Sequence, residues 1–345
     1  MIVKIDNPCE NGDAGDSESG HARQAFAKLT PDQILDAVET LGVRCDGRFL
    51  ALNSYENRVY RIGLEDRAPV VVKFYRPQRW SDRAILEEHA FTLTLAQQEV
   101  PVIAPWVDEQ GHSLHRAGPF RFAVYPCQGG RAPELDNPEQ LELLGRFIAR
   151  IHALGGIKPF TCRPQLDIEG YAIRPARYLQ QQGFIPDHLV AAYASLTTDL
   201  IEQLQISFAR AGKIRSIRLH GDCHPGNILW SESGPQIVDF DDARMGPAVQ
   251  DLWMFLAGEP AQMRTALGHL LEGYGRFADF NPAEIQLIEP LRTLRLIHYA
   301  GWLASRWGDP AFPLAFPWFN TTRYWEEHIL ILREQAALLA EPTLI

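Results

Sequence analysis

The chain has 345 residues, of which 46 % are hydrophobic, and its formal net charge at pH 7 is -10. This length is enough for two domains or for two lobes of one fold. The acidic balance argues against nucleic acid as the main partner, because binding to a phosphate backbone relies on clustered Lys and Arg.

The cysteines and the N-terminal region indicate the compartment. The five cysteines lack the paired spacing of a disulfide framework, so we expect free thiols in a reducing cytosol. The N-terminus has no apolar stretch of signal-peptide length, and no window approaches about 18 apolar residues. We therefore expect a cytoplasmic protein without a membrane span, and a monomer.

The N-terminal residues predict a tail that is followed by a short helix. Residues 1–25 are rich in Gly, Asp, Glu and Ser and show no periodicity, which is typical of a disordered tail. A helix should follow over 29–42, because Thr30 can cap it, Gln33 completes a capping box and Gly42 can end it.

Residues 26–126 predict a small antiparallel sheet that carries one long helix. Apolar runs between polar turns indicate strands at 49–54, 58–64 and 70–75. A helix capped by Ser81 should span 81–99, and two more strands should lie between 101 and 126. We take this region as the first lobe.

Residues 127–345 are mostly helical in pattern and form the second lobe. Helical patterns cover 137–155, 187–211, 251–255, 259–277, 282–306 and 323–339. The Pro- and aromatic-rich stretch 307–318 is typical of a loop. We therefore expect an α+β fold with two lobes, a small antiparallel-sheet N-lobe and a mainly helical C-lobe.

Polar side chains interrupt the helical half between residues 219 and 253. The stretch 227–239 has strand-like ends around the turn-like SESGP, so it predicts a hairpin centred near Ser233. In this hairpin Asn227 and Asp239 would lie nearly opposite, with Cβ atoms roughly 4.5–5.5 Å apart. An amide oxygen and a carboxylate at that distance can share Mg²⁺, which takes its other ligands from water and substrate phosphates.

A further acid lies just before this hairpin. Asp222 precedes Asn227 by five residues, in a loop that Gly221, Pro225 and Gly226 would bend tightly. A carboxylate beside a metal–phosphate site can orient a hydroxyl and accept its proton, which is the layout of phosphoryl transfer.

Other polar residues of this segment have simpler explanations. Asp241 and Asp242 could assist the metal, but a solvated turn explains them equally well. His220, Cys223 and His224 suggest zinc, yet no second pair of ligands lies nearby in the sequence. We expect His220 to pack and hydrogen-bond within the loop.

The stretches HGDCHPGN and VDFDDA resemble the catalytic and metal-binding loops of the aminoglycoside-phosphotransferase-like kinases, which are relatives of the eukaryotic protein kinases. Further stretches resemble a branch of this family that acts in bacterial stress response: LNSYENRVY, VVKFYRP, ILEEHAF, RLHGDCHPGNILW, DDARMGPAVQDLWM and WGDPAFPLAFPW. The resemblance covers about residues 28–335, and it implies a protein-kinase-like fold that uses ATP and Mg²⁺.

The resemblance assigns roles to the polar residues of the second lobe. Asp222 would be the catalytic base. Asn227 and Asp239 would hold Mg²⁺, and Asp239 would also count among the catalytic residues. Asp251 would brace the catalytic loop through hydrogen bonds.

The resemblance also assigns the nucleotide site to the first lobe. Lys73 would contact the α- and β-phosphates of ATP, with Glu88 as its ion-pair partner and Glu87 as the alternative. Ser54 would lie against the phosphates. The backbone that links the lobes would bind adenine through Val124, Tyr125 and Pro126.

The chain departs from the protein-kinase pattern in two places. It has no Gly-x-Gly-x-x-Gly loop, and NSYENR stands in its place, so side chains must do the work of glycine amides. Eleven residues separate Asp239 from Asp251, too few for a long activation loop. Regulation by phosphorylation of such a loop is therefore not expected.

Three functions follow from these observations. The resemblance implies an ATP- and Mg²⁺-dependent Ser/Thr protein kinase of bacterial stress response, whose partner is an acceptor protein. A small-molecule kinase for choline, homoserine or an aminoglycoside shares every catalytic residue and would act on a small alcohol. A nucleotide-binding regulator without turnover is the third alternative.

Overall fold

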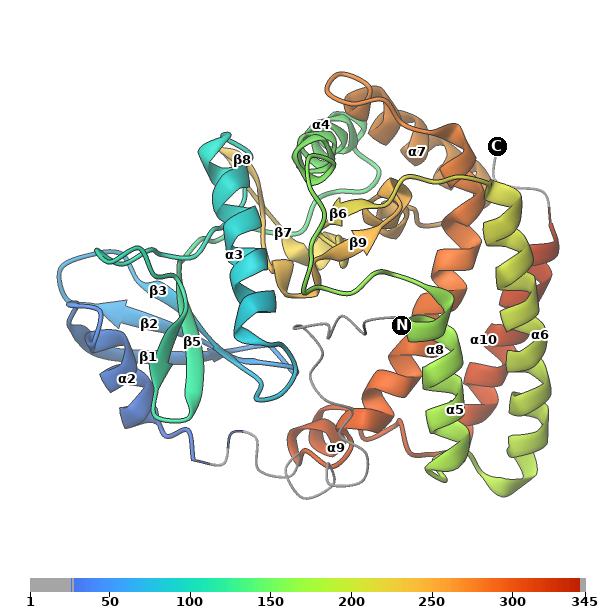
Figure 1. The fold of residues 1–345 in the computed structure, drawn as a ribbon, viewed down its shortest axis with the longest axis horizontal. Coiled ribbons are helices and arrows are strands. Elements are labelled where there is room, and N and C mark those ends of the chain that lie inside the picture. The colour runs from blue at the N-terminus through green and yellow to red at the C-terminus, as the bar shows by residue number, and fades with distance from the viewer. Residues whose placement is uncertain (1–25, 27, 342–345) are drawn as a thin grey trace, which may run out of the picture. The chain divides into compact units, whose positions relative to one another are not determined.

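The computed structural model describes residue 26 and residues 28–341, which divide into two units (Figure 1). The first unit comprises the described residues up to Ala132, together with Phe160–Pro164 and Gly226–Asp242. The second unit comprises the remaining described residues. The predicted lobes, 26–126 and 127–345, are contiguous stretches, and the two later segments that belong to the first unit fall within the predicted second lobe.

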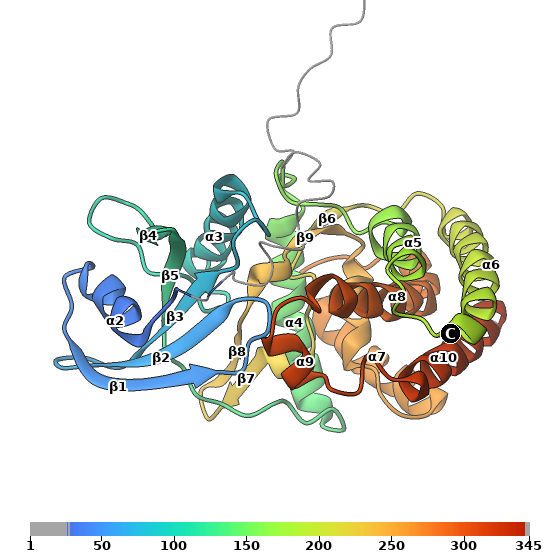
Figure 2. The ribbon, with the colours of Figure 1, turned by 90° about the horizontal axis from the view of Figure 1, so that it is seen from below.

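The first unit is built on a five-stranded antiparallel sheet (Figure 1; Figure 2). Its strands are β1 (Cys45–Leu52), β2 (Arg58–Leu64), β3 (Val70–Tyr75), β4 (His115–Ala117) and β5 (Phe120–Pro126). They lie in the order β1-β2-β3-β5-β4. The strand β3 is therefore internal, and its Lys73 pairs with Val59 of β2 and with Ala123 of β5.

Two helices of the first unit begin where the sequence predicts. Helix α2 (Pro31–Glu39) is capped by Thr30, and the predicted capping box with Gln33 is present. Helix α3 (Asp82–Gln97) is capped by the side chain of Ser81. The predicted tail, residues 1–25, lies outside the described residues.

The side chains of β3 alternate between two cores, because successive residues of a strand point to opposite faces. Val72 and Phe74 belong to the core cluster that contains the buried residues of α2. Tyr75 belongs to a second cluster that contains Ile85 of α3. Lys73 is on the same face of the strand as Tyr75, so β3 directs its side chain toward α3.

The two strands predicted between 101 and 126 are present as β4 and β5, and the bounds of the first predicted strand differ from the observed ones. The first strand begins at Cys45 rather than at residue 49. The apolar stretch 101–107 forms no strand; its Val102 makes an isolated parallel bridge to Ile237. This bridge joins the sheet region to the later segment that carries the predicted metal ligands.

The second unit is mainly helical, as the sequence predicts. Its helices are α4 (Pro138–Gly155), α5 (Arg174–Gln181), α6 (Asp187–Ala211), α7 (Pro260–Tyr274), α8 (Ile288–Arg306), α9 (Ala311–Ala315) and α10 (Thr322–Ala340). Helices α5, α6, α8 and α10 lie alongside one another, and α4 packs on α7 (Figure 1). A two-stranded sheet of β6 (Ile217–Leu219) and β9 (Arg244–Gly246) carries the loop that contains Asp222.

The predicted helices of the second unit are largely confirmed. The boundaries of α6 match the predicted 187–211, whereas the predicted helix 282–306 begins with a 3₁₀ segment, Pro282–Leu287. The predicted helix 251–255 consists of 3₁₀ turns. Two short helices were not predicted: α5, and α9 inside the stretch taken as a loop.

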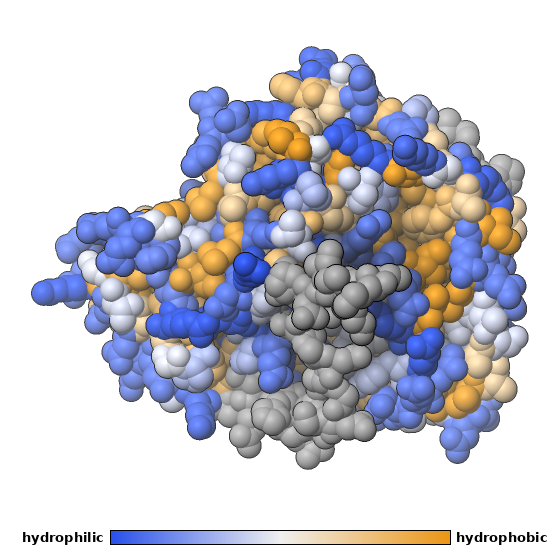
Figure 3. Space-filling view, in the orientation of Figure 1, coloured by the Kyte–Doolittle hydropathy of each residue, from blue (hydrophilic) through white to orange (hydrophobic). Residues whose placement is uncertain are grey.

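Hydrophilic residues cover much of the face shown in Figure 3, and hydrophobic residues reach this surface in separate patches. Across the described residues, no helix combines the length and the apolar content that crossing a membrane requires.

Candidate active site

The predicted hairpin is present, and its register differs from the predicted one by one residue. Strands β7 (Ile228–Ser231) and β8 (Gly234–Ile237) pair Ile228 with Ile237 and Ser231 with Gly234. The amide of Val238 then donates to the carbonyl of Asn227, with a distance of 3.0 Å. Asn227 therefore lies opposite Val238, one position from Asp239, which agrees with the prediction that the two residues are nearly opposite. Asp239 follows directly after the last paired residue.

Asp239 leaves the hairpin in an unusual backbone conformation. Its φ is 63°, in the left-handed region that residues other than glycine rarely adopt. Such a conformation persists only when the surrounding structure imposes it. The turn that follows is a 3₁₀ segment, Phe240–Asp242. Both predicted metal ligands thus lie at the same end of one hairpin in the first unit.

Lys73 forms an ion pair with Asp239. Its Nζ lies 2.6 Å from Oδ1, and the lysine side chain is 10 % exposed while that of the aspartate is 51 % exposed. Burial alone would lower the pKa of Lys73, but the carboxylate of Asp239 raises it, so the ammonium stays charged. The lysine therefore meets the predicted metal ligand within the first unit.

The two glutamates considered as partners of Lys73 lie in different surroundings. Glu88 is 2 % exposed, and burial raises its pKa to about 7 although Arg163 and Lys73 oppose the shift. Glu87 is directed elsewhere, because its carboxylate accepts hydrogen bonds from Thr161 and from the amide of Cys162. Of the two glutamates, Glu88 is therefore the better candidate for the partner of Lys73, because it is buried and close enough to sense the charge of the lysine. In this structure, however, Lys73 forms its ion pair with Asp239.

A buried polar chain lies on the same side of β3 as Lys73. The hydroxyl of Tyr75 is 2.9 Å from that of Tyr125 and 2.7 Å from His89 Nε2. Burial lowers the pKa of His89 to about 3, so its ring is neutral. The ammonium of Lys73 lies 5.6 Å from the centroid of the Tyr125 ring. These hydrogen-bonded side chains pack near Lys73 and add no charge to its surroundings.

The segment predicted to bind adenine has fewer free backbone groups than the prediction assumes. The carbonyl of Val124 accepts a hydrogen bond of 2.7 Å from Trp106. Pro126 has no N–H to donate. Ser54 lies in the predicted turn between β1 and β2 and is partly buried. The roles of Ser54, Val124, Tyr125 and Pro126 toward a nucleotide stay predictions.

Three residues that sequence reasoning did not single out surround Asp241. This acid is 4 % exposed, so it does not belong to a solvated turn. Asn57 donates to its carboxylate over 3.0 Å, Arg79 forms an ion pair with it, and Arg163 donates to its main-chain carbonyl over 2.7 Å. Of these three residues, only Asn57 could have been suspected from the sequence, because it lies in NSYENR, where side chains are expected to replace the amides of a glycine-rich loop.

In the second unit, Asp222 is held by two side chains. Its Oδ1 accepts from Arg295 of α8 over 2.5 Å, and His224 Nε2 lies 3.5 Å from its Oδ2. Gly221, just before it, has a φ of 88° and allows the bend that the sequence predicts. The predicted catalytic base is thus partly exposed and paired with a guanidinium.

Asp251 makes the hydrogen bonds predicted for it. Its carboxylate accepts from the amides of His220 and Gly221 over 2.8 and 2.9 Å, and from His152 over 3.1 Å. Burial raises the pKa of this acid, but the hydrogen bond from His152 and those from the loop outweigh burial and lower it. Asp251 is therefore an ionised acceptor that fixes the loop before Asp222.

The cysteines differ in part from the expectation of free thiols. Cys45, Cys127 and Cys223 are free, whereas Cys162 is disulfide-bonded, so the expectation is wrong at Cys162. Burial raises the pKa of the Cys223 thiol well above its ordinary value.

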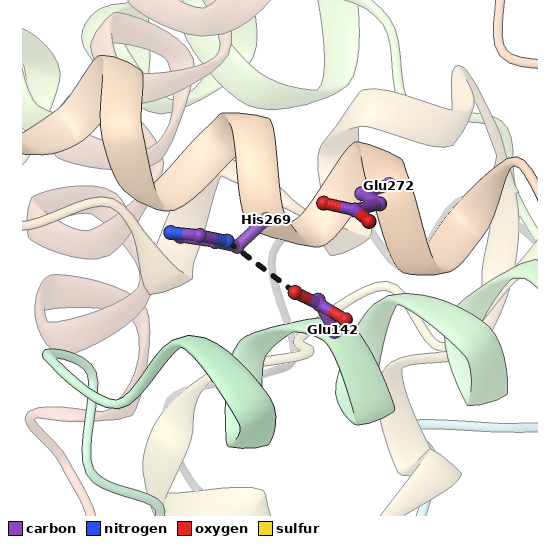
Figure 4. A group of neighbouring side chains, drawn as sticks. All are labelled: Glu142, His269 and Glu272. Atoms are coloured by element: carbon purple, nitrogen blue, oxygen red, sulfur yellow. Dashed lines mark ion pairs between the residues drawn. The ribbon is translucent and has the colours of Figure 1, made fainter.

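A separate group of side chains with metal-binding atoms lies in the second unit (Figure 4). Glu142 comes from α4, while His269 and Glu272 come from α7, and their ligand atoms lie within 4.8 Å of one another. His269 Nδ1 is 3.5 Å from Glu142 Oε1, so an ion pair between neighbouring helices explains the arrangement. The group contains none of the predicted site residues.

The comparisons with known proteins identify the family of the chain. Residues 48–288 match the model of the family described as "Phosphotransferase enzyme family". "Stress response kinase A" of Escherichia coli (strain K12) is 47 % identical over 92 % of this chain and 96 % of its own length. "Serine/threonine protein kinase RdoA" of Salmonella typhimurium (strain LT2) is 44 % identical over the same shares.

A solved structure with low sequence identity shows the same fold. Amicoumacin kinase hAmiN, in complex with AMP-PNP, Ca²⁺ and Ami, has a TM-score of 0.72 at 18 % identity. The alignment covers 92 % of this chain and 96 % of that one. The resemblance stated from the sequence and the predicted α+β, protein-kinase-like fold are both confirmed. The chain belongs to the phosphotransferase enzyme family and is an ATP-dependent kinase.

Proposed function

We propose that the chain is a Mg²⁺-dependent Ser/Thr protein kinase that acts in the cytoplasm during bacterial stress response. The ion pair between Lys73 and Asp239 carries the catalytic part, because it brings the predicted phosphate-binding cation to a predicted metal ligand. The protein acceptor rests on the relative named as a Ser/Thr protein kinase at 44 % identity. The role in stress response rests on relatives of similar identity named for it.

The residues of the first unit suit a nucleotide with a divalent cation. Asn227 and Asp239 offer an amide oxygen and a carboxylate at the end of one hairpin, which are donors that Mg²⁺ accepts. When bound, Mg²⁺ would neutralise charge on the phosphates. Lys73 would exchange its contact with Asp239 for the α- and β-phosphates, and Glu88 would then be the nearby carboxylate that balances it.

Asp222 would act on the acceptor hydroxyl. As the acceptor oxygen forms its bond to the γ-phosphorus, the bond from that phosphorus to the β,γ-bridging oxygen breaks, and ADP leaves. The hydroxyl proton passes to the carboxylate of Asp222, whose other oxygen is held by Arg295. Positioning of this kind can supply roughly 7–11 kcal/mol of the barrier reduction.

Labelled ATP tests this proposal directly. The protein is incubated with γ-labelled ATP and Mg²⁺, in one series with generic Ser/Thr protein substrates and in another with a panel of small alcohols. Label on protein supports the proposal. Label on a small alcohol instead supports a small-molecule kinase, which the fold of amicoumacin kinase keeps as the second candidate. Label on neither would support a regulator without turnover.

Substitution of Asp222 identifies the base. We expect Asp222→Ala to lower turnover by about 10²–10⁴-fold or more, since a general base typically contributes that much. ATP affinity measured by calorimetry should change little, because Asp222 lies outside the first unit that carries Lys73 and Asp239. Turnover at the wild-type rate in this variant would refute the assignment.

A further inference from the structure

A group of polar and charged side chains surrounds the buried acid two residues after Asp239. We call Asn57, Arg79, Arg163 and Asp241 the Asp241 cluster. The Oδ2 atom of Asp241 accepts a hydrogen bond of 3.0 Å from Asn57 Nδ2 and pairs with Arg79 Nη1. The acid itself is 4 % exposed. Its charge is therefore balanced inside the first unit rather than by solvent.

Arg79 connects this acid to its neighbour in the same turn. Its second terminal nitrogen, Nη2, lies 2.8 Å from Asp242 Oδ1, so one guanidinium binds two successive acids. Its Nε lies 3.9 Å from Glu56 Oε1, and its side chain is 14 % exposed. A planar guanidinium with several donors suits this task, since it binds carboxylates in a fixed geometry. Arg79 thereby restricts the whole 3₁₀ turn after Asp239.

Asn57 connects the same acid to the turn that replaces the glycine-rich loop. Its Oδ1 accepts from the amide of Arg76 over 3.1 Å, while its Nδ2 donates to Asp241. Asn57 is 4 % exposed, so both contacts are shielded from water. The predicted phosphate turn around Ser54 and the predicted metal loop are therefore joined through Asn57 and, by way of Arg79, through Glu56.

Arg163 holds the main chain of the same turn from a third segment. Its Nη1 donates to the carbonyl of Asp241 over 2.7 Å, and its Nε donates to the carbonyl of Ala84 over 2.8 Å. Its guanidinium lies 4.6 Å from the centroid of the Trp80 ring. Hydrogen bonds thus hold both the side chain and the backbone of Asp241, two residues after Asp239.

We propose that Asp241 and Arg79 are positioning residues, which hold the turn Phe240–Asp242 so that the carboxylate of Asp239 is presented to Lys73 and to a divalent cation. The proposal rests on the proposed function for the role of Asp239. It assigns Asp241 to the support of the metal ligand and not to the metal itself. It also explains how a loop without glycines is coupled to the metal loop, through Asn57.

The competing reading is that Asp241 binds the cation directly. Its Oδ1 atom is buried and has no hydrogen-bond partner among the described residues, so this oxygen could in principle serve as a ligand. The two readings predict different behaviour for Arg79. If Asp241 positions Asp239, removal of Arg79 should weaken Mg²⁺-dependent binding. If Asp241 binds the cation directly, removal of Arg79 should leave that binding unchanged.

The test compares single and double variants in ligand-free and nucleotide-bound protein. Arg79→Met, Asp241→Asn and the double variant are titrated with AMP-PNP by calorimetry, with and without Mg²⁺. Hydrogen exchange of the amides of residues 238–242 is measured in the ligand-free proteins. Arg79→Lys keeps the charge without the planar fork, and it replaces Arg79→Met if that variant does not fold. Arg48→Met is the matched control, because Arg48 is an arginine of the same unit with a side chain that is 74 % exposed.

We expect both single variants to weaken Mg²⁺-dependent binding by about 10–100-fold, the range found for residues that orient metal ligands. The double variant should be no weaker than the weaker single one, because the two residues act as a unit. Amide protection in 238–242 should fall in both single variants and not in Arg48→Met. Partial recovery of affinity in Arg79→Lys relative to Arg79→Met also supports the proposal.

A loss of Mg²⁺-dependent binding in Asp241→Asn alone, with Arg79→Met unchanged in affinity and in amide protection, would overturn the inference and favour a direct ligand. Unchanged protection and affinity in both variants would overturn it as well. Wild-type protein without Mg²⁺-dependent nucleotide binding would instead contradict the proposed function. The exchange measurement on ligand-free protein would still decide the positioning role in that case.

Discussion

Asp251 in the second unit and Asp241 in the first are buried carboxylates that accept hydrogen bonds from different kinds of donor. Asp251 in the second unit accepts from two main-chain amides and from His152. Asp241 in the first unit accepts from Asn57 and pairs with Arg79. Both are nearly inaccessible to water, at 1 % and 4 % exposure.

The difference lies in what each arrangement depends on. Main-chain amides are present whatever the residue types of the loop, so two of the three contacts given for Asp251 depend on the path of the backbone. The contacts of Asp241 depend on side chains that lie 162 and 184 positions away in the sequence. The loop before Asp222 is therefore held mainly through its main-chain amides, whereas the loop after Asp239 is held by an ion pair and a hydrogen bond between side chains. Substitutions can test each half of this comparison.

The largest effect on stability is expected for Asp251→Ala. This change leaves the buried amides of His220 and Gly221 and the ring of His152 without their acceptor. Leaving one buried hydrogen-bond donor without an acceptor typically costs about 1–3 kcal/mol, so the loss of the acceptor of several donors should lower the free energy of unfolding by at least about that amount. Urea unfolding followed by circular dichroism measures it. Asp251→Asn keeps one acceptor oxygen and should lose less, and equal losses in both variants would contradict the account.

The next largest effect concerns metal binding in the first unit. Asp239→Ala should weaken Mg²⁺-dependent binding of AMP-PNP by at least about 100-fold, because residues that merely orient a ligand already cost about 10–100-fold. Calorimetry with and without Mg²⁺ separates this loss from any loss of nucleotide affinity alone. The carboxylate is 51 % exposed, so the effect should not require unfolding. Unchanged Mg²⁺ dependence would remove Asp239 from the metal site.

Much of the local structure could be predicted from the sequence, because its determinants lie within a few residues. The capping box of Thr30 and Gln33 sets the start of α2, and Ser81 sets the start of α3. The hairpin of the metal loop was also predicted, but its register was not. The turn consists of the residues between Ser231 and Gly234, shorter than the SESGP stretch suggests, and Gly234 closes it with a φ of 99°.

The support of the site could not be predicted, because its partners are far apart along the chain. Nothing local to Arg79 or Arg163 indicates that both meet the turn of Asp241. The pairing of Arg295 with Asp222 likewise joins α8 to a loop 73 residues earlier. Periodicity and motif spacing report on neighbours in sequence, and such contacts become visible only when the chain is folded.

Charge balance in the first unit should also appear in the pH dependence of stability. Burial raises the pKa of Glu88 in the folded protein to about 7, above its unfolded value of about 4.5. The folded state therefore binds the proton of the Glu88 carboxyl more tightly than the unfolded state does. As the pH rises between about 4.5 and 7, the free energy of unfolding of the wild-type protein falls for this reason. Glu88→Gln cannot lose a proton, so relative to wild type its stability should rise by about 2–3 kcal/mol from pH 5 to pH 8.

Urea unfolding of both proteins at pH 5, 6, 7 and 8 gives this difference directly. Because other titrating groups are common to the two proteins, their contributions cancel in the comparison. Asp251 has a lowered pKa and is held by different donors, so an Asp251→Asn series over the same range should not rise in this way. A difference between Glu88→Gln and wild type that stays constant with pH would show that Glu88 titrates normally.

The smallest effect is expected for the neighbouring glutamate. Glu87 is partly buried, and its carboxylate accepts hydrogen bonds from Thr161 and from the amide of Cys162 rather than contacting the lysine. Glu87→Gln keeps an acceptor oxygen, so stability should change by about 1 kcal/mol or less. AMP-PNP affinity should stay within about twofold of wild type, while Glu88→Gln should weaken it if Glu88 balances Lys73 in the bound state. A reversal of that order in calorimetry would make Glu87 the partner of Lys73. In that case the carboxylate that balances the charge of Lys73 would change when the nucleotide binds. Such a change would distinguish the first unit from the loop that Asp251 holds.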